Sequence, residues 1–201
     1  DVDAIIAACD SSTQLIFVCS PNNPTGTTLP RAELERLLKA RGDDSAVVVD
    51  EAYIEFGDKP SAIELLNRYS NLLVLRTLSK ALGFAGVRCG AVAGPVDVVR
   101  LLSAVQAPYA LATPVVECVE DAMQDEQLEL AEQTVREIIA ERERVSAALA
   151  DYGFVSRVWP SDANFLLIRV DDATQVMRRC QEQNVLLRHF GGDLDDCIRI
   201  T

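Results

Sequence analysis

The sequence is poor in the residues that build metal centres and hydrolytic sites. Its 201 residues include one histidine, His189, and six cysteines that form no Cys-x-x-Cys pair. A zinc site needs several such ligands at close spacing, and a serine hydrolase needs a histidine together with a nucleophile in an elbow motif. We therefore expect no metal site and no hydrolytic triad, and we interpret the cysteines as reduced core residues.

The chain also has no long apolar run, no internal repeat and no excess of positive charge. No stretch approaches the roughly 20 consecutive apolar residues of a transmembrane helix. The net charge of −12 argues against nucleic acid or an anionic membrane as a partner. Because 49% of the residues are hydrophobic and 25% are charged, the composition indicates a globular protein rather than a disordered one.

One segment combines a lysine with small hydroxyl side chains and a nearby arginine. It reads Arg76-Thr77-Leu78-Ser79-Lys80-Ala81 and is followed, after an apolar stretch, by Arg88. A lysine in this setting can form a Schiff base beside an anion site, which is the chemistry of enzymes that use pyridoxal phosphate. The alternative is a solvated lysine in a surface loop, where lysines are common.

A carboxylate follows the second apolar run of the chain. Residues 46–49 are Ala-Val-Val-Val and run into Asp50-Glu51-Ala52-Tyr53. The pyridinium ring of pyridoxal phosphate needs an acidic partner, because a nearby negative charge keeps its nitrogen protonated. Asp50 can fill this role, and the alternative is a turn or N-cap residue after a strand.

A stiff turn follows the first apolar run. Residues 15–19 lead into Ser20-Pro21-Asn22-Asn23-Pro24-Thr25-Gly26, where Asn23, Pro24 and Gly26 occupy the first, second and fourth places that a type I turn prefers. Each proline restricts the residue before it. We expect a rigid type I turn that aims the Asn23 side chain, and the alternative is an ordinary turn asparagine.

The order of apolar and amphipathic segments indicates an α/β fold. The expected strands are continuously apolar and most are separated by helices, which is typical of a largely parallel sheet that helices cover on both faces. Asn23, Asp50 and Lys80 each follow such a strand, and ligands bind at this end of the strands in open α/β sheets. We predict strands at residues 14–19, 47–50, 72–75, 89–93, 154–158, 165–170, 185–187 and 198–200, and helices at residues 3–8, 30–41, 61–68, 95–105, 126–150 and 173–183.

Two domains are expected, with a boundary near residue 120. Residues 1–120 carry the strands of the largely parallel sheet, and residues 121–201 carry a bridging helix and a smaller C-terminal α+β domain. The apolar stripe of the helix at 126–150 is interrupted by Arg142. Because this stripe is short and imperfect, we expect the helix to connect the two domains rather than to form a free coiled coil.

In their order and spacing these motifs resemble those of the fold-type I pyridoxal-phosphate-dependent aminotransferases, and among them the histidinol-phosphate aminotransferases. The segments that carry the resemblance are residues 20–26, 50–53, 76–90, 159–165 and 197–201. The resemblance implies part of a cofactor-binding large domain at residues 1–120 and a small domain at 121–201, both incomplete. It also implies the C-terminal portion of a longer, homodimeric enzyme. Family members place a glycine-containing turn, an aromatic ring and a tyrosine for the neighbouring subunit's site upstream of this sequence.

Carried over residue by residue, the resemblance assigns roles around the cofactor ring. It implies that Lys80 forms the Schiff base with pyridoxal phosphate and later moves the proton between the substrate and the cofactor. It implies that Asp50 pairs with the pyridinium nitrogen. Asn23 and Tyr53 would bind the phenolic oxygen of the ring.

The resemblance also assigns the anionic groups. Thr77, Ser79 and Arg88 would bind the cofactor phosphate, a task that suits a guanidinium because it presents a rigid fork of donors. Arg199 would bind the carboxylate of the amino-acid substrate. Arg188 is a candidate for the anionic end of a phosphorylated substrate, and an arginine at this place could equally be a surface residue at a strand end.

The function implied by this resemblance is transamination in histidine biosynthesis. An amino group would move between glutamate and a phosphorylated imidazole substrate, as in the transamination of histidinol phosphate with 2-oxoglutarate, in the cytoplasm and without nucleic-acid or membrane partners. The cofactor residues do not separate this activity from that of an aromatic aminotransferase or a phospho-amino-acid decarboxylase. A module that keeps the fold without turnover is a third alternative.

Overall fold

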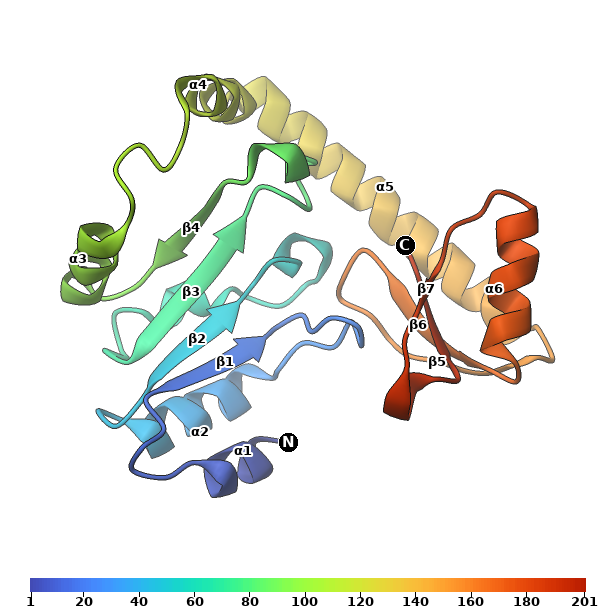
Figure 1. Ribbon diagram of the computed structural model, residues 1–201, viewed down its shortest axis with the longest axis horizontal. Helices are drawn as coiled ribbons and strands as arrows, with labels where there is room; N and C mark the ends of the chain where they lie inside the picture. The colour runs from blue at the N-terminus through green and yellow to red at the C-terminus, as the bar shows by residue number, and fades with distance from the viewer.

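The computed structural model describes residues 1–201 and contains two four-stranded sheets with a long helix running between them (Figure 1). The first sheet has the strand order β1-β2-β3-β4. Its strands are β1 Leu15–Cys19, β2 Ala46–Asp50, β3 Leu72–Thr77 and β4 Gly90–Ala93. The first three strands are parallel and β4 is antiparallel to β3, so the expected largely parallel sheet is confirmed.

The second sheet is antiparallel throughout. Its strand order is β5-β6-β8-β7. The strands are β5 Val155–Val158, β6 Leu166–Val170, β7 Arg188–His189 and β8 Cys197–Ile200. The strand expected at 185–187 is wrong, because that segment pairs with no strand and the pairing begins only at Arg188. The domain boundary near residue 120 stays a prediction.

Six α-helices and several short 3₁₀ turns complete the chain. The helices are α1 Val2–Ala8, α2 Arg31–Arg41, α3 Val96–Val105, α4 Thr113–Ala122, α5 Asp125–Ala150 and α6 Ala173–Glu182. The sequence did not indicate α4, and the helix expected at 61–68 is reduced to the 3₁₀ turn Ala62–Leu65. None of the helices combines the length and the apolar character needed to cross a membrane.

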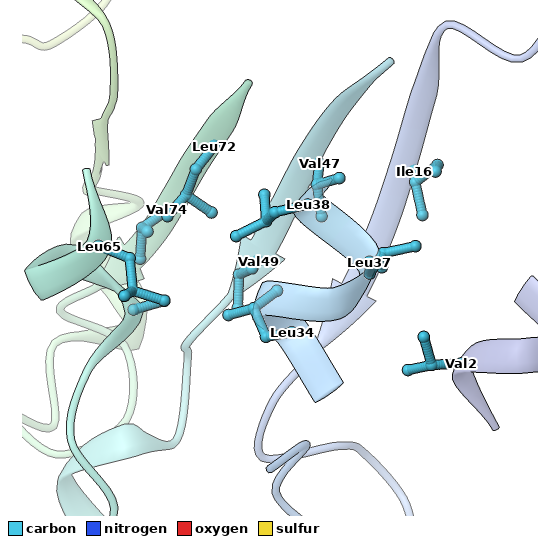
Figure 2. Packing of buried hydrophobic residues seen from close by; sticks show 11 residues of the cluster. Val2, Ile16, Leu34, Leu37, Leu38, Val47, Val49, Leu65, Leu72 and Val74 are labelled. Atoms are coloured by element: carbon cyan, nitrogen blue, oxygen red, sulfur yellow. The ribbon is translucent and has the colours of Figure 1, made fainter. Parts of the chain in front are cut away.

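The main core lies on one face of the first sheet. Figure 2 shows Leu34, Leu37 and Leu38 of α2 packed against Val47 and other apolar side chains of the strands. Side chains alternate across a strand, so every second residue of these strands points toward α1 and α2. This alternation explains why continuously apolar strands can fill a one-sided core with half of their side chains.

The opposite face of the first sheet is less completely covered. Leu15 and Phe17, which alternate with the buried Ile16 in β1, are 58% and 67% exposed. The helices that pack on the core, α1 and α2, both lie on the other side. The opposite face is open only along β1, since Val48 of β2 and Leu73 of β3 on the same face are 7% and 5% exposed.

The long helix α5 joins the two sheets. Val135, on its inward face, packs in a cluster with Tyr53 and Phe56 from the loop after β2 and with Ala163 and Phe165 from the segment before β6. The C-terminal part of α5 contacts β5 (Figure 1). The bridging helix expected at 126–150 is thus found at Asp125–Ala150.

Candidate functional site

A cavity of about 550 Å³ opens where β2 and β3 end. Asp50 is the last residue of β2 and Thr77 the last residue of β3, and the loop after β3 carries the others. Because neighbouring parallel strands end at the same edge of a sheet, residues far apart in the sequence meet there. The candidate site residues that line this cavity are Asp50, Thr77, Ser79, Lys80 and Arg88.

Two adjacent carboxylates at the end of β2 have different surroundings. Asp50 lines the cavity, and its Oδ1 accepts a hydrogen bond from the backbone nitrogen of Ala52 at 3.0 Å. Glu51 is only 2% exposed and accepts hydrogen bonds from Ser61 Oγ and the Ala62 nitrogen, both at 2.6 Å. Glu51 therefore stabilises the neighbouring loop, and Asp50 is the carboxylate that a ligand in the cavity can meet.

Lys80 lies inside the site rather than on a surface loop. It is partly buried, lines the cavity, and its Nζ lies 5.2 Å from the centroid of the Tyr53 ring. Just before it, Thr77 Oγ1 donates to Ser79 Oγ at 2.9 Å and accepts from the Ser79 nitrogen at 3.2 Å. These bonds fix the two hydroxyl groups next to the lysine. The alternative of a solvated loop lysine does not fit this environment.

Arg88, which also lines the cavity, has an unusual backbone conformation. Its φ of 54° is in the left-handed region, which costs a residue other than glycine about 1–2 kcal/mol. Such strained positions cluster at functional sites, because the surrounding structure must hold them. Its Nη1 donates to the Ala85 carbonyl at 3.0 Å. Together with the hydroxyls of Thr77 and Ser79, the guanidinium provides donors suited to a phosphate group.

A second group of candidate residues meets at the junction of the two sheets. Arg199 of β8 donates through Nη1 to Asn23 Oδ1 at 2.9 Å, although 176 positions separate them in the sequence. The guanidinium carbon of Arg199 lies 5.0 Å from the centroid of the Phe165 ring, and this ring makes an edge-to-face contact with Tyr53 at 5.1 Å. Phe165 thus connects the second group to Lys80 through Tyr53. No role for Phe165 followed from the sequence motifs.

The turn that carries Asn23 differs from the expected one. The Gly26 nitrogen donates to the Asn22 carbonyl at 2.7 Å, and the Asn22 nitrogen donates to the Thr27 carbonyl at 2.8 Å. The bond from Gly26 to Asn23 that is typical of a type I turn is absent, so the turn is not closed in the expected way. The closing bond starts one residue earlier, and Gly26 adopts a φ of +75° to complete it.

Arg188 lies beside Arg199 on the second sheet. The two residues are register partners in the antiparallel pair of β7 and β8, so their side chains share one face of the sheet. Arg188 is exposed, and its guanidinium carbon lies 5.9 Å from the centroid of the Phe190 ring. Two guanidinium groups therefore sit on the sheet face that Arg199 turns toward Asn23.

The negative charge of Asp50 contributes to the raised pKa of the Cys19 thiol. Cys19 ends β1 and is the register partner of Asp50 on β2. Partial burial, and secondarily the negative charge of Asp50, raises the pKa of the Cys19 thiol. The thiol therefore stays protonated near neutral pH and is a poor nucleophile there.

These observations define an α/β protein whose parallel strands end at a cavity. The cavity is lined by an amine, a carboxylate and hydrogen-bond donors that suit a phosphate group. The family model of aminotransferase class I and II matches residues 1–201, and the chain belongs to this family. The resemblance seen in the sequence is thereby confirmed at the level of the family.

The curated relatives are longer than this chain. Histidinol-phosphate aminotransferase of Xylella fastidiosa is 45% identical over 204 residues, which cover 100% of this chain and 56% of the relative. Histidinol-phosphate aminotransferase of Xanthomonas campestris pv. campestris is 46% identical over the same shares. The chain thus spans little more than half the length of the curated relatives it matches.

Solved structures share the fold. Histidinol-phosphate aminotransferase from Sinorhizobium meliloti, in complex with pyridoxal-5'-phosphate, has a TM-score of 0.88 at 25% identity and is matched over 100% of this chain and 56% of that chain. L-threonine-O-3-phosphate decarboxylase from Porphyromonas gingivalis has a TM-score of 0.80 at 27% identity, over 98% of this chain and 62% of that chain. The expected fold-type I architecture is confirmed, and the same fold serves proteins named for different reactions.

The residues of the cavity fit pyridoxal phosphate by their chemistry. A cofactor with an aldehyde, a basic ring nitrogen and a phosphate requires an amine, an acid and several hydrogen-bond donors. Lys80, Asp50 and Arg88 supply one of each kind around a single cavity, and two hydroxyl groups add further donors.

Proposed function

We propose that this chain provides the cofactor site and the substrate-carboxylate site of a pyridoxal-phosphate-dependent aminotransferase. The substrates would be glutamate and a phosphorylated imidazole compound, as in the transamination of histidinol phosphate with 2-oxoglutarate during histidine biosynthesis. The observation that carries the proposal is the meeting of Lys80, Asp50 and Arg88 around one cavity. The curated histidinol-phosphate aminotransferases, at 45% and 46% identity, support the choice of substrate.

Lys80 is the catalytic base of the proposal. When bound, pyridoxal phosphate supplies an electron sink for the negative charge that develops at the substrate α-carbon. Lys80 Nζ would hold the cofactor between turnovers, and its amine would carry a proton from the substrate α-carbon to the cofactor in one half-reaction and in the opposite direction in the other. Asp50 keeps the ring nitrogen protonated by its negative charge, which makes the sink effective.

The remaining cofactor contacts fix the ring and its phosphate. Thr77, Ser79 and Arg88 bind the phosphate through hydroxyl groups and a guanidinium. Asn23 and Tyr53 bind the phenolic oxygen. The edge-to-face contact of Tyr53 with Phe165 supports this orientation, because it restricts rotation of the tyrosine ring.

Two arginines provide for anionic substrates. Arg199 binds the α-carboxylate of the amino acid, and in the free protein its guanidinium is held by Asn23. Arg188 binds the second anionic end, a side-chain carboxylate in one substrate and a phosphate in the other. Their position as register partners supports this pairing, because it presents two cations to glutamate, which has two carboxylates.

A phospho-amino-acid decarboxylase is the second candidate. The similarity to L-threonine-O-3-phosphate decarboxylase from Porphyromonas gingivalis favours it, since a phosphorylated amino acid would use the same pair of arginines. An aromatic aminotransferase would retain the cofactor contacts and dispense with Arg188. These candidates differ in the products that they release.

A homodimer in the cytoplasm is part of the proposal. Apolar side chains that remain exposed at two separate places on this chain support an interface, because exposed apolar surface marks association sites. They lie on the uncovered face of β1 and along α3 to the following loop: Leu15, Phe17, Val96, Leu101, Val105 and Tyr109.

Product analysis on the full-length natural protein tests the proposal. With histidinol phosphate and 2-oxoglutarate we expect glutamate to form, and we expect Lys80→Ala to abolish its formation. Lys59→Ala is the matched control, because the Lys59 amine pairs with Asp58 at the surface, 2.7 Å away, and should retain activity. Release of carbon dioxide from a phospho-amino acid without glutamate formation would instead favour the decarboxylase, and no turnover with either would contradict an enzymatic role.

A further inference from the structure

One buried arginine on α5 has no part in the proposed chemistry. The side chain of Arg142 is only 10% exposed, and it interrupts the apolar stripe of the helix. Its Nη1 donates to two backbone carbonyls, that of Phe56 at 3.0 Å and that of Ala163 at 2.8 Å. Its Nη2 and Nε contact the Glu143 carboxylate at 2.8 and 3.0 Å. Burial of a guanidinium is unfavourable unless it is hydrogen-bonded, so these bonds offset the cost of burying the Arg142 charge.

The two carbonyls lie in segments that adjoin different sheets. Phe56 ends the 3₁₀ turn Ile54–Phe56, directly after the cofactor-site residue Tyr53. Ala163 is fully buried in the segment that leads into β6 and lies two residues before Phe165. A single guanidinium therefore joins the loop at the end of β2 to the entry of the second sheet, while its own backbone belongs to the helix between them.

The segments joined by Arg142 are the ones that bring Arg199 to the cavity. Phe165 contacts Tyr53 on one side and Arg199 on the other, at 5.1 and 5.0 Å. A second backbone bond crosses the same junction, from the Asp162 nitrogen to the Gly26 carbonyl at 2.7 Å. Any change in the spacing of these segments moves Arg199 relative to Lys80.

We propose that Arg142 is a positioning residue that sets the spacing between the two sheets and thereby holds Arg199 where the substrate carboxylate must bind. This inference rests on the proposed aminotransferase function. It assigns Arg142 no contact with substrate or cofactor. The cofactor contacts of Asp50, Thr77, Ser79, Lys80 and Arg88 all lie on the side of the first sheet, so loss of Arg142 should affect the amino-acid substrate far more than the cofactor.

The test compares Arg142→Met and Arg142→Lys with Arg144→Met in the full-length natural protein carrying its cofactor. Arg144 is the matched control, because its guanidinium contacts only Glu141 on the same exposed helix surface. For Arg142→Met we expect KM for glutamate to rise about tenfold to a hundredfold, as displacement of a binding group by about 1 Å can do. The dissociation constant of the cofactor should change by less than about threefold, because Arg142 makes no contact with the cofactor site. Arg142→Lys should recover part of the loss, since it retains a charged donor.

Hydrogen exchange provides a readout that does not depend on turnover. In Arg142→Met, amides of residues 161–165 should exchange faster, while those of 46–50 in the first sheet should not change. Unchanged KM and exchange in both Arg142 variants would overturn the inference. A parallel loss of cofactor affinity, substrate affinity and melting temperature would also overturn it, because that pattern indicates a purely structural residue. If the parent protein shows no transamination, the proposed function fails. Faster exchange at residues 161–165 in Arg142→Met would even then show that Arg142 holds the segment before β6 in place.

Discussion

Gly26 is the position where one added methyl group should separate the two sheets. A Cβ at this residue would lie 2.2 Å from Ser161 Oγ, 2.7 Å from Ser161 Cβ and 3.1 Å from Ser161 Cα. The φ of +75° adds backbone strain for any other residue. The left-handed conformation costs alanine about 1 kcal/mol, and overpacking of this kind adds about 2 kcal/mol. We expect Gly26→Ala to lower the free energy of unfolding by about 3 kcal/mol.

Gly83→Ala isolates the backbone part of this cost. Gly83 has a similar φ of +72°, and no atom lies within 4 Å of the position of its Cβ. Its replacement should cost about 1 kcal/mol. In urea denaturation, the double variant Gly26→Ala with Ser161→Gly should recover about 1–2 kcal/mol relative to the sum of the single changes, because it removes the group that clashes. Equal costs at Gly26 and Gly83, within about 0.5 kcal/mol, would refute the close contact between the two loops.

Two further predictions concern charge. Asp50→Asn should lower the pKa of the Cys19 thiol, because the negative charge of Asp50 contributes to raising it. Iodoacetamide should then alkylate Cys19 faster at pH 8 in cofactor-free protein, as measured by peptide mass spectrometry with Cys180 as the internal reference. An unchanged rate would contradict the placement of Asp50. The Tyr69 hydroxyl and, next, Arg68 hold the pKa of Glu35 below its ordinary value of 4.5. A depressed carboxyl pKa stabilises the folded state above the unfolded pKa and ceases to do so as pH falls through the folded one. Glu35→Gln should therefore lower the melting temperature at pH 7, the deficit should shrink as the pH falls below 4.5, and a deficit independent of pH would argue against this network.

The residues of the cavity could be predicted from the sequence because they lie at or just after the ends of strands. Asp50 and Lys80 follow apolar runs that could only be buried strands, and parallel strands end at one edge, so their approach followed from topology without knowledge of any contact. The role of Asp50 itself came from the resemblance to the family and not from the strand pattern.

The junction between the sheets was out of reach of the same reasoning. The bond between Arg199 and Asn23 depends on how two sheets pack, and no periodicity in the sequence encodes that packing. Phe165 has only the signal of an aromatic residue before a strand, which is common in cores. The turn at Asn23 was mistaken because preferences for turn positions do not specify which carbonyl closes the turn.

The uncovered face of β1 shows a further limit of the sequence pattern. A continuously apolar strand indicates that both of its faces are destined for burial. It does not say which segment covers each face. Leu15 and Phe17 are exposed here, whereas Ile16 between them is buried by helices of the same chain.

The proposed chemistry requires that Lys80 carries the cofactor, and reduction with borohydride tests this requirement most directly. The full-length natural protein, incubated with pyridoxal phosphate, reduced and digested, should show the added mass of the reduced cofactor on the peptide that contains Lys80. The alternative acceptors are Lys39, which lies near Glu35, and Lys59, which pairs with Asp58. Label on either of these lysines, or no label on Lys80 at saturating cofactor, would contradict the assignment.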